Sequence, residues 1–148
     1  MELEIKRIKP ILEQLYEIER LKHQVFHLKT DDSSIKTSYD VFHAVHNQLI
    51  PFGLYLDGSL IGGCYVSCYG DSLFINYLFI KEEYPNSGLR LGRYLLERVL
   101  ELKPIFEEYF KKEFNVSRLT ANNDKSRSIY EKLGYSSEGR TPFMSKKI

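Results

Sequence analysis

Residues 73–102 read LFINYLFI-KEEYPNSG-LRLGRYLLERVLEL, and the rest of the chain is organised around them. The first eight residues are nearly all apolar or aromatic, which is typical of a strand buried on both faces. A polar loop follows, and Leu91, Leu95, Val99 and Leu102 then recur at helical spacing. A strand, a glycine-bearing loop and a helix in this order predict an anion site, because the first N–H groups of the helix point into the loop without internal partners.

The loop carries further groups that suit an anionic ligand. Gly88 and Gly92 let a ligand approach the backbone closely, and Arg90 and Arg93 add positive charge. Many strand-to-helix turns carry a glycine only to make the corner, so this stretch alone leaves a purely structural role open.

A second stretch, residues 123–135, reads NDKSRSIYEKLGY and predicts a short capped helix. Asn123 is a good N-cap residue, and Gly134 suits the position just after a helix. Asn123, Ser126 and Tyr130 are spaced three and four apart, so they share one helix face. This polar stripe predicts a face that borders a cleft; the alternative is a surface helix with a tyrosine at its edge.

Together the two stretches resemble the GNAT superfamily of N-acetyltransferases, and the resemblance extends over nearly the whole chain. In that family a loop of the form Gln/Arg-x-x-Gly-x-Gly/Ala opens a helix and holds the pyrophosphate of acetyl-CoA; residues 87–92, SGLRLG, match it here. The family's later element is Asn-x-x-Ala/Ser-x-x-x-Tyr followed by Gly-Phe/Tyr. Its positions are filled here by Asn123, Ser126, Tyr130, Gly134 and Tyr135.

The loop departs from the family pattern at two positions. Ser87 stands where the family has Gln or Arg, and Arg90 stands at the middle glycine. The loop after Ile80 is also longer than is usual, so a register with Gly88 at the middle-glycine position stays open.

The resemblance implies an acetyl-CoA-dependent N-acetyltransferase that moves the acetyl group directly to a primary amine in a ternary complex. Backbone groups at Leu78, Phe79 and Ile80 would pair with the pantetheine arm and polarise the thioester. Asn123 would bond the arm with Ser126 beside it, and Tyr130 would protonate the leaving thiolate as general acid. The pyrophosphate would be held by Ser87, Gly88, Leu89, Arg90, Leu91, Gly92 and Arg93.

The base that deprotonates the amine stays open. The central strand offers only Asn76 and Tyr77 as polar groups, and Glu82 and Glu83 lie just beyond it. We expect these two carboxylates to be solvated and dispensable. A water chain, capture of an already neutral amine, or a histidine that reaches the acceptor would also serve.

Two pairs of histidines have helical spacing, His23 with His27 and His43 with His46. No carboxylate completes a recognisable metal motif beside either pair, so we expect partly exposed helix histidines and no metal site. The two cysteines, Cys64 and Cys68, are four apart in a predicted strand, too far for an easy disulfide, and are expected to be buried thiols.

Composition limits the class of protein. The 148 residues fit one domain, and 43% hydrophobic with 28% charged residues is ordinary for a soluble protein. A net charge of +1 argues against nucleic acid or anionic lipid as a partner. No apolar run could span a bilayer and no signal-peptide pattern opens the sequence, so we expect a cytoplasmic protein.

Several readings stay open on sequence alone. A non-catalytic acyl-CoA-binding module is the chief alternative function, and a small-molecule binding protein without CoA is a more distant one. The acceptor could be an amine metabolite, an antibiotic, a polyamine or a protein N-terminus. A homodimer is compatible with the sequence.

The remaining chain predicts an α+β domain over residues 1–148, which by resemblance is a mixed, mostly antiparallel sheet flanked by helices. Strands are expected at 3–8, 52–56, 60–69, 115–121, 135–138 and 142–147. Helices are expected from Lys9-Pro10 to about Leu28 and over 39–48, with a polar break at 30–34. Asp57-Gly58 predicts a tight hairpin turn, and Pro104 a helix break.

Overall fold

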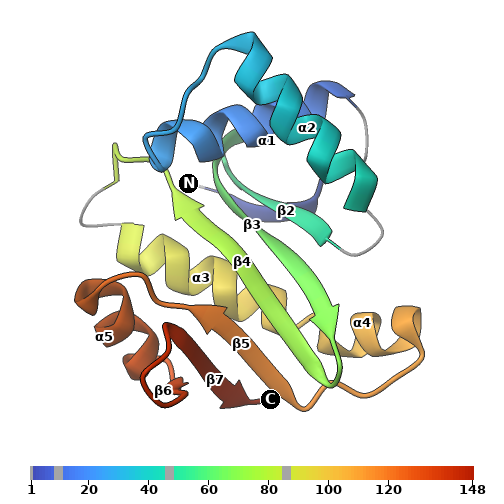
Figure 1. The fold of residues 1–148 in the computed structure, drawn as a ribbon, viewed down its shortest axis with the longest axis vertical. Helices are drawn as coiled ribbons and strands as arrows, with labels where there is room; N and C mark the ends of the chain where they lie inside the picture. The colour runs from blue at the N-terminus through green and yellow to red at the C-terminus, as the bar shows by residue number, and fades with distance from the viewer. Residues whose placement is uncertain (1, 9–11, 46–48, 85–87) are drawn as a thin grey trace.

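A computed structural model of the chain describes residues 2–8, 12–45, 49–84 and 88–148 (Figure 1). Its elements are β1 (Leu3–Arg7), α1 (Leu12–Val25), α2 (Asp32–Val45), β2 (Leu49–Leu56), β3 (Ser59–Tyr69), β4 (Ser72–Ile80), α3 (Gly88–Leu100), α4 (Lys103–Phe110), β5 (Val116–Thr120), α5 (Asp124–Lys132), β6 (Ser136–Ser137) and β7 (Phe143–Lys147).

The strands form one seven-stranded sheet in the order β1-β2-β3-β4-β5-β7-β6. Among the described strands only β4 and β5 pair in parallel; the other pairs are antiparallel. The β2–β3 hairpin turns at Asp57 and Gly58, whose φ angles of 48° and 84° are both positive, as a two-residue type I′ turn requires. The predicted class, a mixed and mostly antiparallel α+β sheet, is confirmed.

Helices cover both faces of the sheet. On one face Leu15, Ile18 and Leu21 of α1 pack against Tyr65 of β3 and Phe79 of β4, and α2 packs on α1. On the other face α3 and α4 close a larger core (Figure 1). Its helical members are Leu95, Leu96, Val99 and Phe106. Burial of these apolar side chains is the main force that holds the layers together.

A β-bulge interrupts β4 at Tyr77. Asn76 pairs with Tyr65 of β3 and Phe79 pairs with Gly63, so β4 takes one extra residue between them. Tyr77 occupies the left-handed region with φ 53° and is 54% exposed. Beyond the bulge the alternation shifts, and Phe79 joins the core on the α1 face. The prediction of a strand buried on both faces is therefore wrong at Tyr77.

The bulge coincides with the point at which β4 leaves β5. The parallel pairing between these strands ends at Ile75 and Leu119. Past Ile75 the β4 edge toward β5 has no ladder partner among the described residues, so the two strands separate and open the sheet. This opening positions the site described below.

Helices α2 and α4 differ most from the sequence prediction. Helix α2 begins at Asp32 instead of Tyr39. The Asp31 carboxylate accepts hydrogen bonds from the backbone N–H and the hydroxyl of Ser34, at 3.0 and 2.7 Å, so the supposed polar break is an N-cap. These bonds also lower the pKa of Asp31. Helix α4 was not predicted; Pro104 starts this helix after ending the previous one, because it is tolerated in a first turn.

The other boundaries are close to the prediction. Helix α1 ends at Val25 and not at Leu28, and the predicted start at Lys9-Pro10 lies outside the described residues. The closing strands β6 and β7 are shorter than expected. No helix in the described part of the chain is long and apolar enough to cross a membrane.

Candidate active site

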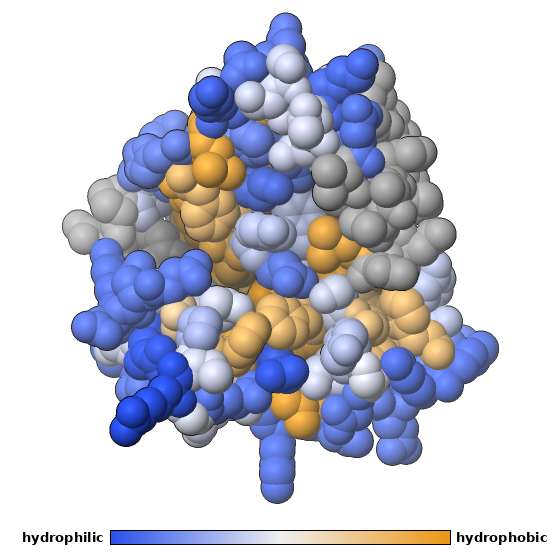
Figure 2. Space-filling model, viewed as in Figure 1, coloured by the Kyte–Doolittle hydropathy of each residue, from blue (hydrophilic) through white to orange (hydrophobic). Residues whose placement is uncertain are grey.

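Two cavities meet where β4 and β5 separate. The first, here called the α3/α5 cavity, has a volume of about 380 Å³ and lies between the end of β4, α3 and α5. The second, the α1/β5 cavity, has a volume of about 710 Å³ and is lined from α1, α2, β4, β5 and α5. Leu78, Ser126 and Tyr130 line both cavities. Figure 2 shows apolar residues at the surface in the middle of this face, surrounded by hydrophilic ones.

The α3/α5 cavity contains much of the predicted cofactor site. Its walls include the predicted backbone segment 78–80 at the end of β4, together with Gly92 and Arg93 from the first turns of α3. Its described lining is Leu78, Phe79, Ile80, Lys81, Glu82, Tyr84, Gly92, Arg93, Ser126, Ile129, Tyr130 and Leu133. The lining is mainly apolar, with few charges.

The predicted phosphate loop is only partly described. Ser87 lies outside the described residues, and of Gly88 and Leu89 only the backbone at the start of α3 is described. The remaining predicted members differ in position. Leu91 packs against the core, Arg90 is exposed, and Gly92 and Arg93 line the cavity.

Gly92 faces open space. A Cβ built on this residue would meet no atom of the described residues within 4 Å, its own helical turn aside, so the absence of a side chain leaves room on the cavity wall. Arg93 is engaged by a neighbour: its Nε donates to Glu97 Oε1 at 2.8 Å, one helical turn later. Arg90 is exposed near the start of α3, where the helix N-terminus adds partial positive charge.

Helix α5 brings the predicted polar stripe to the junction. Asn123 is its N-cap, with Oδ1 accepting from the Ser126 backbone N–H at 2.8 Å. The helix ends before Gly134, whose φ of 95° suits the left-handed position there. Asn123, Ser126 and Tyr130 all line the α1/β5 cavity, and Asn123 does not line the α3/α5 cavity.

Tyr130 is half-buried at the junction of the two cavities. Its ring packs edge-on against Tyr135 with centroids 6.2 Å apart. Its hydroxyl makes no hydrogen bond within the described part of the chain. Burial raises the pKa of Tyr130, with a smaller contribution from Cys64, so the phenol keeps its proton beyond the ordinary tyrosine range.

The cysteines are free thiols that cannot act as ready nucleophiles. Cys64 is fully buried, and burial raises its pKa to about 12. Cys68 is only half-buried, against the prediction, and burial raises its pKa to about 11. Both stay protonated at neutral pH, when a thiolate would be needed for attack.

The loop carboxylates are solvated, as expected. The side chains of Glu82 and Glu83 are 62% and 73% exposed. Glu82 pairs with the exposed ring of His27, Oε1 to Nε2 at 2.9 Å. His43 and His46 have no described side chains. Among the described residues, no three His, Cys, Asp or Glu groups gather as metal ligands would.

His23 contradicts the expectation of a partly exposed histidine. It is 5% exposed, lines the α1/β5 cavity, and bonds Ser38 and the Lys29 carbonyl. Sequence reasoning missed this cluster, which also contains Glu19, 2% exposed. The available signal was the placement of Glu19 and His23, four apart, on the apolar face of α1.

A third hollow of about 740 Å³ lies at the far end of the sheet, between β1, β2, α3 and α4. Its lining is mostly apolar and includes Leu3, Ile5, Tyr94, Ile105 and Tyr109. It contains none of the predicted site residues, so volume alone does not mark the site.

Comparisons with known proteins point to one family. The sequence model described as "Acetyltransferase (GNAT) family" matches residues 12–135. A search of curated proteins finds no match.

Solved structures share the fold at low sequence identity. The PaiA N-acetyltransferase from Thermoplasma acidophilum, solved with coenzyme A, has a TM-score of 0.65 at 21% identity, with 100% of both chains covered. The ribosomal-protein-S18-alanine N-acetyltransferase from Escherichia coli has a TM-score of 0.70 at 16% identity, covering 99% of this chain and 94% of that one. Aminoglycoside 6'-acetyltransferase type Ii has a TM-score of 0.70 at 16% identity, covering 97% and 96%. The family match spans most of the chain, and the chain therefore belongs to the acetyltransferase (GNAT) family.

Proposed function

We propose that this family member transfers an acetyl group from acetyl-CoA directly to a primary amine while both are bound. The observation that carries the proposal is the junction of the two cavities at Leu78, Ser126 and Tyr130. Two substrates that enter from opposite sides would meet there, and transfer between them needs no covalent enzyme intermediate. Family membership supports an acyl-CoA as the donor.

The α3/α5 cavity fits the donor. Its apolar walls suit the pantetheine arm, and the N-terminus of α3 beside it suits the phosphates, because unpaired N–H groups and the helix dipole favour an anion. Gly92 leaves room for close approach. The thioester supplies the activated acetyl group.

The end of β4 supplies the donor's backbone partners. Past Ile75 the β4 edge that faces β5 has no ladder partner in the described chain. Backbone groups of Leu78, Phe79 and Ile80 on that edge can pair with an amide-bearing arm as a further strand would. The same groups can hold the thioester carbonyl and favour the charge that develops on its oxygen.

In this proposal Tyr130 is the general acid. Its hydroxyl makes no hydrogen bond in the described structure, and the residue lines both cavities. The raised pKa keeps the phenol protonated at neutral pH, so it can donate its proton to the departing thiolate. Neither Cys64 nor Cys68 is needed for the transfer.

The α1/β5 cavity would receive the amine. Its lining mixes aromatic and apolar side chains with the polar groups of Ser38, Asn76, Thr120 and Asn122. The similar structures include enzymes named for a ribosomal-protein alanine, for aminoglycosides and for spermidine. The proposal therefore includes both a small-molecule amine and a protein N-terminus as acceptors.

Two measurements test the proposal. Calorimetry with CoA should show binding, and a panel of amines should then release CoA thiol from acetyl-CoA. The panel would contain spermidine, an aminoglycoside, an amino-acid amide and a peptide with a free N-terminus. CoA binding with no release for any amine would support the non-catalytic binding module. Failure to bind CoA at high micromolar concentration would refute both readings.

A further inference from the structure

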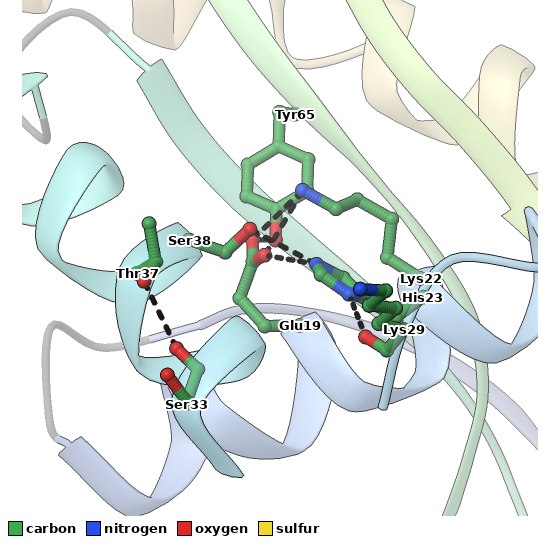
Figure 3. Close-up of polar contacts among 8 residues, drawn as sticks. All are labelled: Glu19, Lys22, His23, Lys29, Ser33, Thr37, Ser38 and Tyr65. Carbon is green, nitrogen blue, oxygen red and sulfur yellow. Dashed lines mark hydrogen bonds and ion pairs between the residues drawn. The ribbon is translucent and has the colours of Figure 1, made fainter. Parts of the chain in front are cut away.

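A buried polar cluster joins α1, α2 and β3 beside the α1/β5 cavity. It consists of Glu19, Lys22 and His23 from α1, Ser38 from α2 and Tyr65 from β3. Figure 3 shows these side chains converging on one another, with the Lys29 carbonyl at one end. Glu19 is 2% exposed and His23 is 5% exposed. Groups buried this deeply require partners, and their arrangement can be read from those partners.

The neighbours of His23 define where its proton resides. Nδ1 lies 2.6 Å from the Lys29 carbonyl oxygen, which can only accept a hydrogen bond, so Nδ1 carries the proton. Nε2 of the neutral ring is then an acceptor, and it lies 2.9 Å from the Ser38 hydroxyl. Ser38 therefore donates to His23. This leaves a basic ring nitrogen with a hydroxyl in front of it.

Glu19 supplies negative charge beside that nitrogen. The Tyr65 hydroxyl donates to Oε1, and the Lys22 ammonium lies 3.1 Å from Oε1 and 3.0 Å from Oε2. Oε2 lies 3.6 Å from His23 Nε2. Burial and the Glu19 charge raise the pKa of Tyr65, so Tyr65 remains the donor.

The charges that face His23 therefore form an arrangement that tolerates protonation. The Lys22 ammonium and the Glu19 carboxylate offset one another, and the carboxylate is within reach of Nε2. A proton arriving at Nε2 would convert its contact with Glu19 into an ion pair.

The cluster opens toward the reacting centre. Lys22, His23 and Ser38 line the α1/β5 cavity, and so do Ser126 and Tyr130. The hydroxyl–imidazole pair thus shares a cavity with the proposed acid, from the side on which the amine would enter. A histidine that served only to join α1 to α2 would not need to border this cavity.

We propose that Ser38 and His23 accept the proton that the amine loses, with Glu19 stabilising the charged ring. This proposal rests on the proposed function. The ammonium N–H bond breaks as its proton passes to the Ser38 oxygen, and the Ser38 proton passes to His23 Nε2. The products are a neutral amine, a regenerated hydroxyl and an imidazolium, which returns its proton to solvent after transfer. Ser38 contacts the amine, and His23 acts through Ser38.

The test compares His23→Gln and Ser38→Ala with His27→Gln as the matched control. His27 lies four residues further along, is exposed, and does not line the α1/β5 cavity. Initial rates would be measured from neutral pH upward with acetyl-CoA and the panel amine that has the highest kcat/KM. Thermal melts and CoA affinity would be measured for every variant.

The proposal predicts a loss that depends on pH. Near neutral pH, His23→Gln should lower kcat/KM by about 100-fold, the usual contribution of a general base, and Ser38→Ala should also lower it. The difference in kcat/KM from the wild type should shrink as the pH approaches the pKa of the chosen amine, about 8 for an α-amino group and about 10 for an alkylamine, because the amine then loses its own proton without help. CoA affinity should stay unchanged, and His27→Gln should match the wild type throughout.

Each other outcome overturns the proposal. Rates of His23→Gln equal to those of His27→Gln refute it, and so does a loss of constant size at every pH, which a structural role would produce. In both cases turnover by the wild type leaves the proposed function intact. A wild type that releases no CoA with any amine refutes both.

Discussion

Tyr130→Phe separates a chemical role of the phenol from a structural one. The hydroxyl makes no hydrogen bond in the described chain, and the ring packs on Tyr135 at 6.2 Å. Removing the oxygen keeps that packing, so the free energy of unfolding should change by less than about 1 kcal/mol. Loss of the proton donor should lower kcat by about 100-fold, which corresponds to about 2.7 kcal/mol in the barrier.

The assay follows thiol release at saturating acetyl-CoA and amine, alongside a thermal melt and CoA calorimetry. Tyr84→Phe is the matched control, because Tyr84 lines the same α3/α5 cavity and the substitution is identical. It should leave kcat near the wild-type value. Wild-type kcat in Tyr130→Phe would remove the phenol from the mechanism. A lowered melting temperature with unchanged kcat would assign it to packing.

Gly92→Asp should weaken CoA binding by about tenfold or more, because the open space at Gly92 would hold a carboxylate beside the phosphates. Gly92→Asn is the uncharged control, and calorimetry should show that it binds CoA with nearly the wild-type affinity. Glu82→Gln and Glu83→Gln should each keep kcat within about tenfold, since both side chains are solvated, and a 100-fold fall in steady-state rate would contradict this. Burial raises the pKa of Tyr135 from 10.0 to about 12. The protonated phenol therefore contributes about 3 kcal/mol to the free energy of unfolding below about pH 10, and this contribution is lost as the pH rises to about 12. The double variant Tyr135→Phe, Ser117→Ala lacks both hydroxyls of the Ser117–Tyr135 hydrogen bond. In denaturant melts over that pH range, its free energy of unfolding should fall less steeply with pH than that of the wild type. An equal fall would contradict the assignment.

The elements around the site were predictable because each carries a strong local signal. Asn123 and Gly134 mark both ends of α5 by their chemistry, and an apolar run followed by a leucine repeat marks β4 and α3. The hairpin at Asp57 has equally local causes. Helix α4 was missed because Pro104 signals both the end of one helix and the start of another, and only the first meaning was applied.

The bulge and the buried cluster were not predictable in the same way. Tyr77 has a positive φ, which its residue type disfavours. This conformation follows from the tertiary structure, because β4 stays paired with β3 on one side and is no longer paired with β5 on the other. His23 and Ser38 are 15 residues apart and meet only because α2 packs on α1. Periodicity places His23 on a helix, whereas Ser38 lies just before the helix predicted over 39–48, and the contact between the two helices depends on tertiary packing.

A crystal structure of the chain with CoA tests the account most directly. The account predicts that the pyrophosphate lies at the start of α3 and that the pantetheine arm runs along Leu78, Phe79 and Ile80. The CoA sulfur should lie within hydrogen-bond reach of the Tyr130 hydroxyl, slightly beyond the range of about 2.6–3.2 Å that holds for pairs without sulfur. The α1/β5 cavity should remain open to an amine. A CoA molecule bound elsewhere, such as the apolar hollow between β1 and α4, or a sulfur remote from Tyr130, would contradict it.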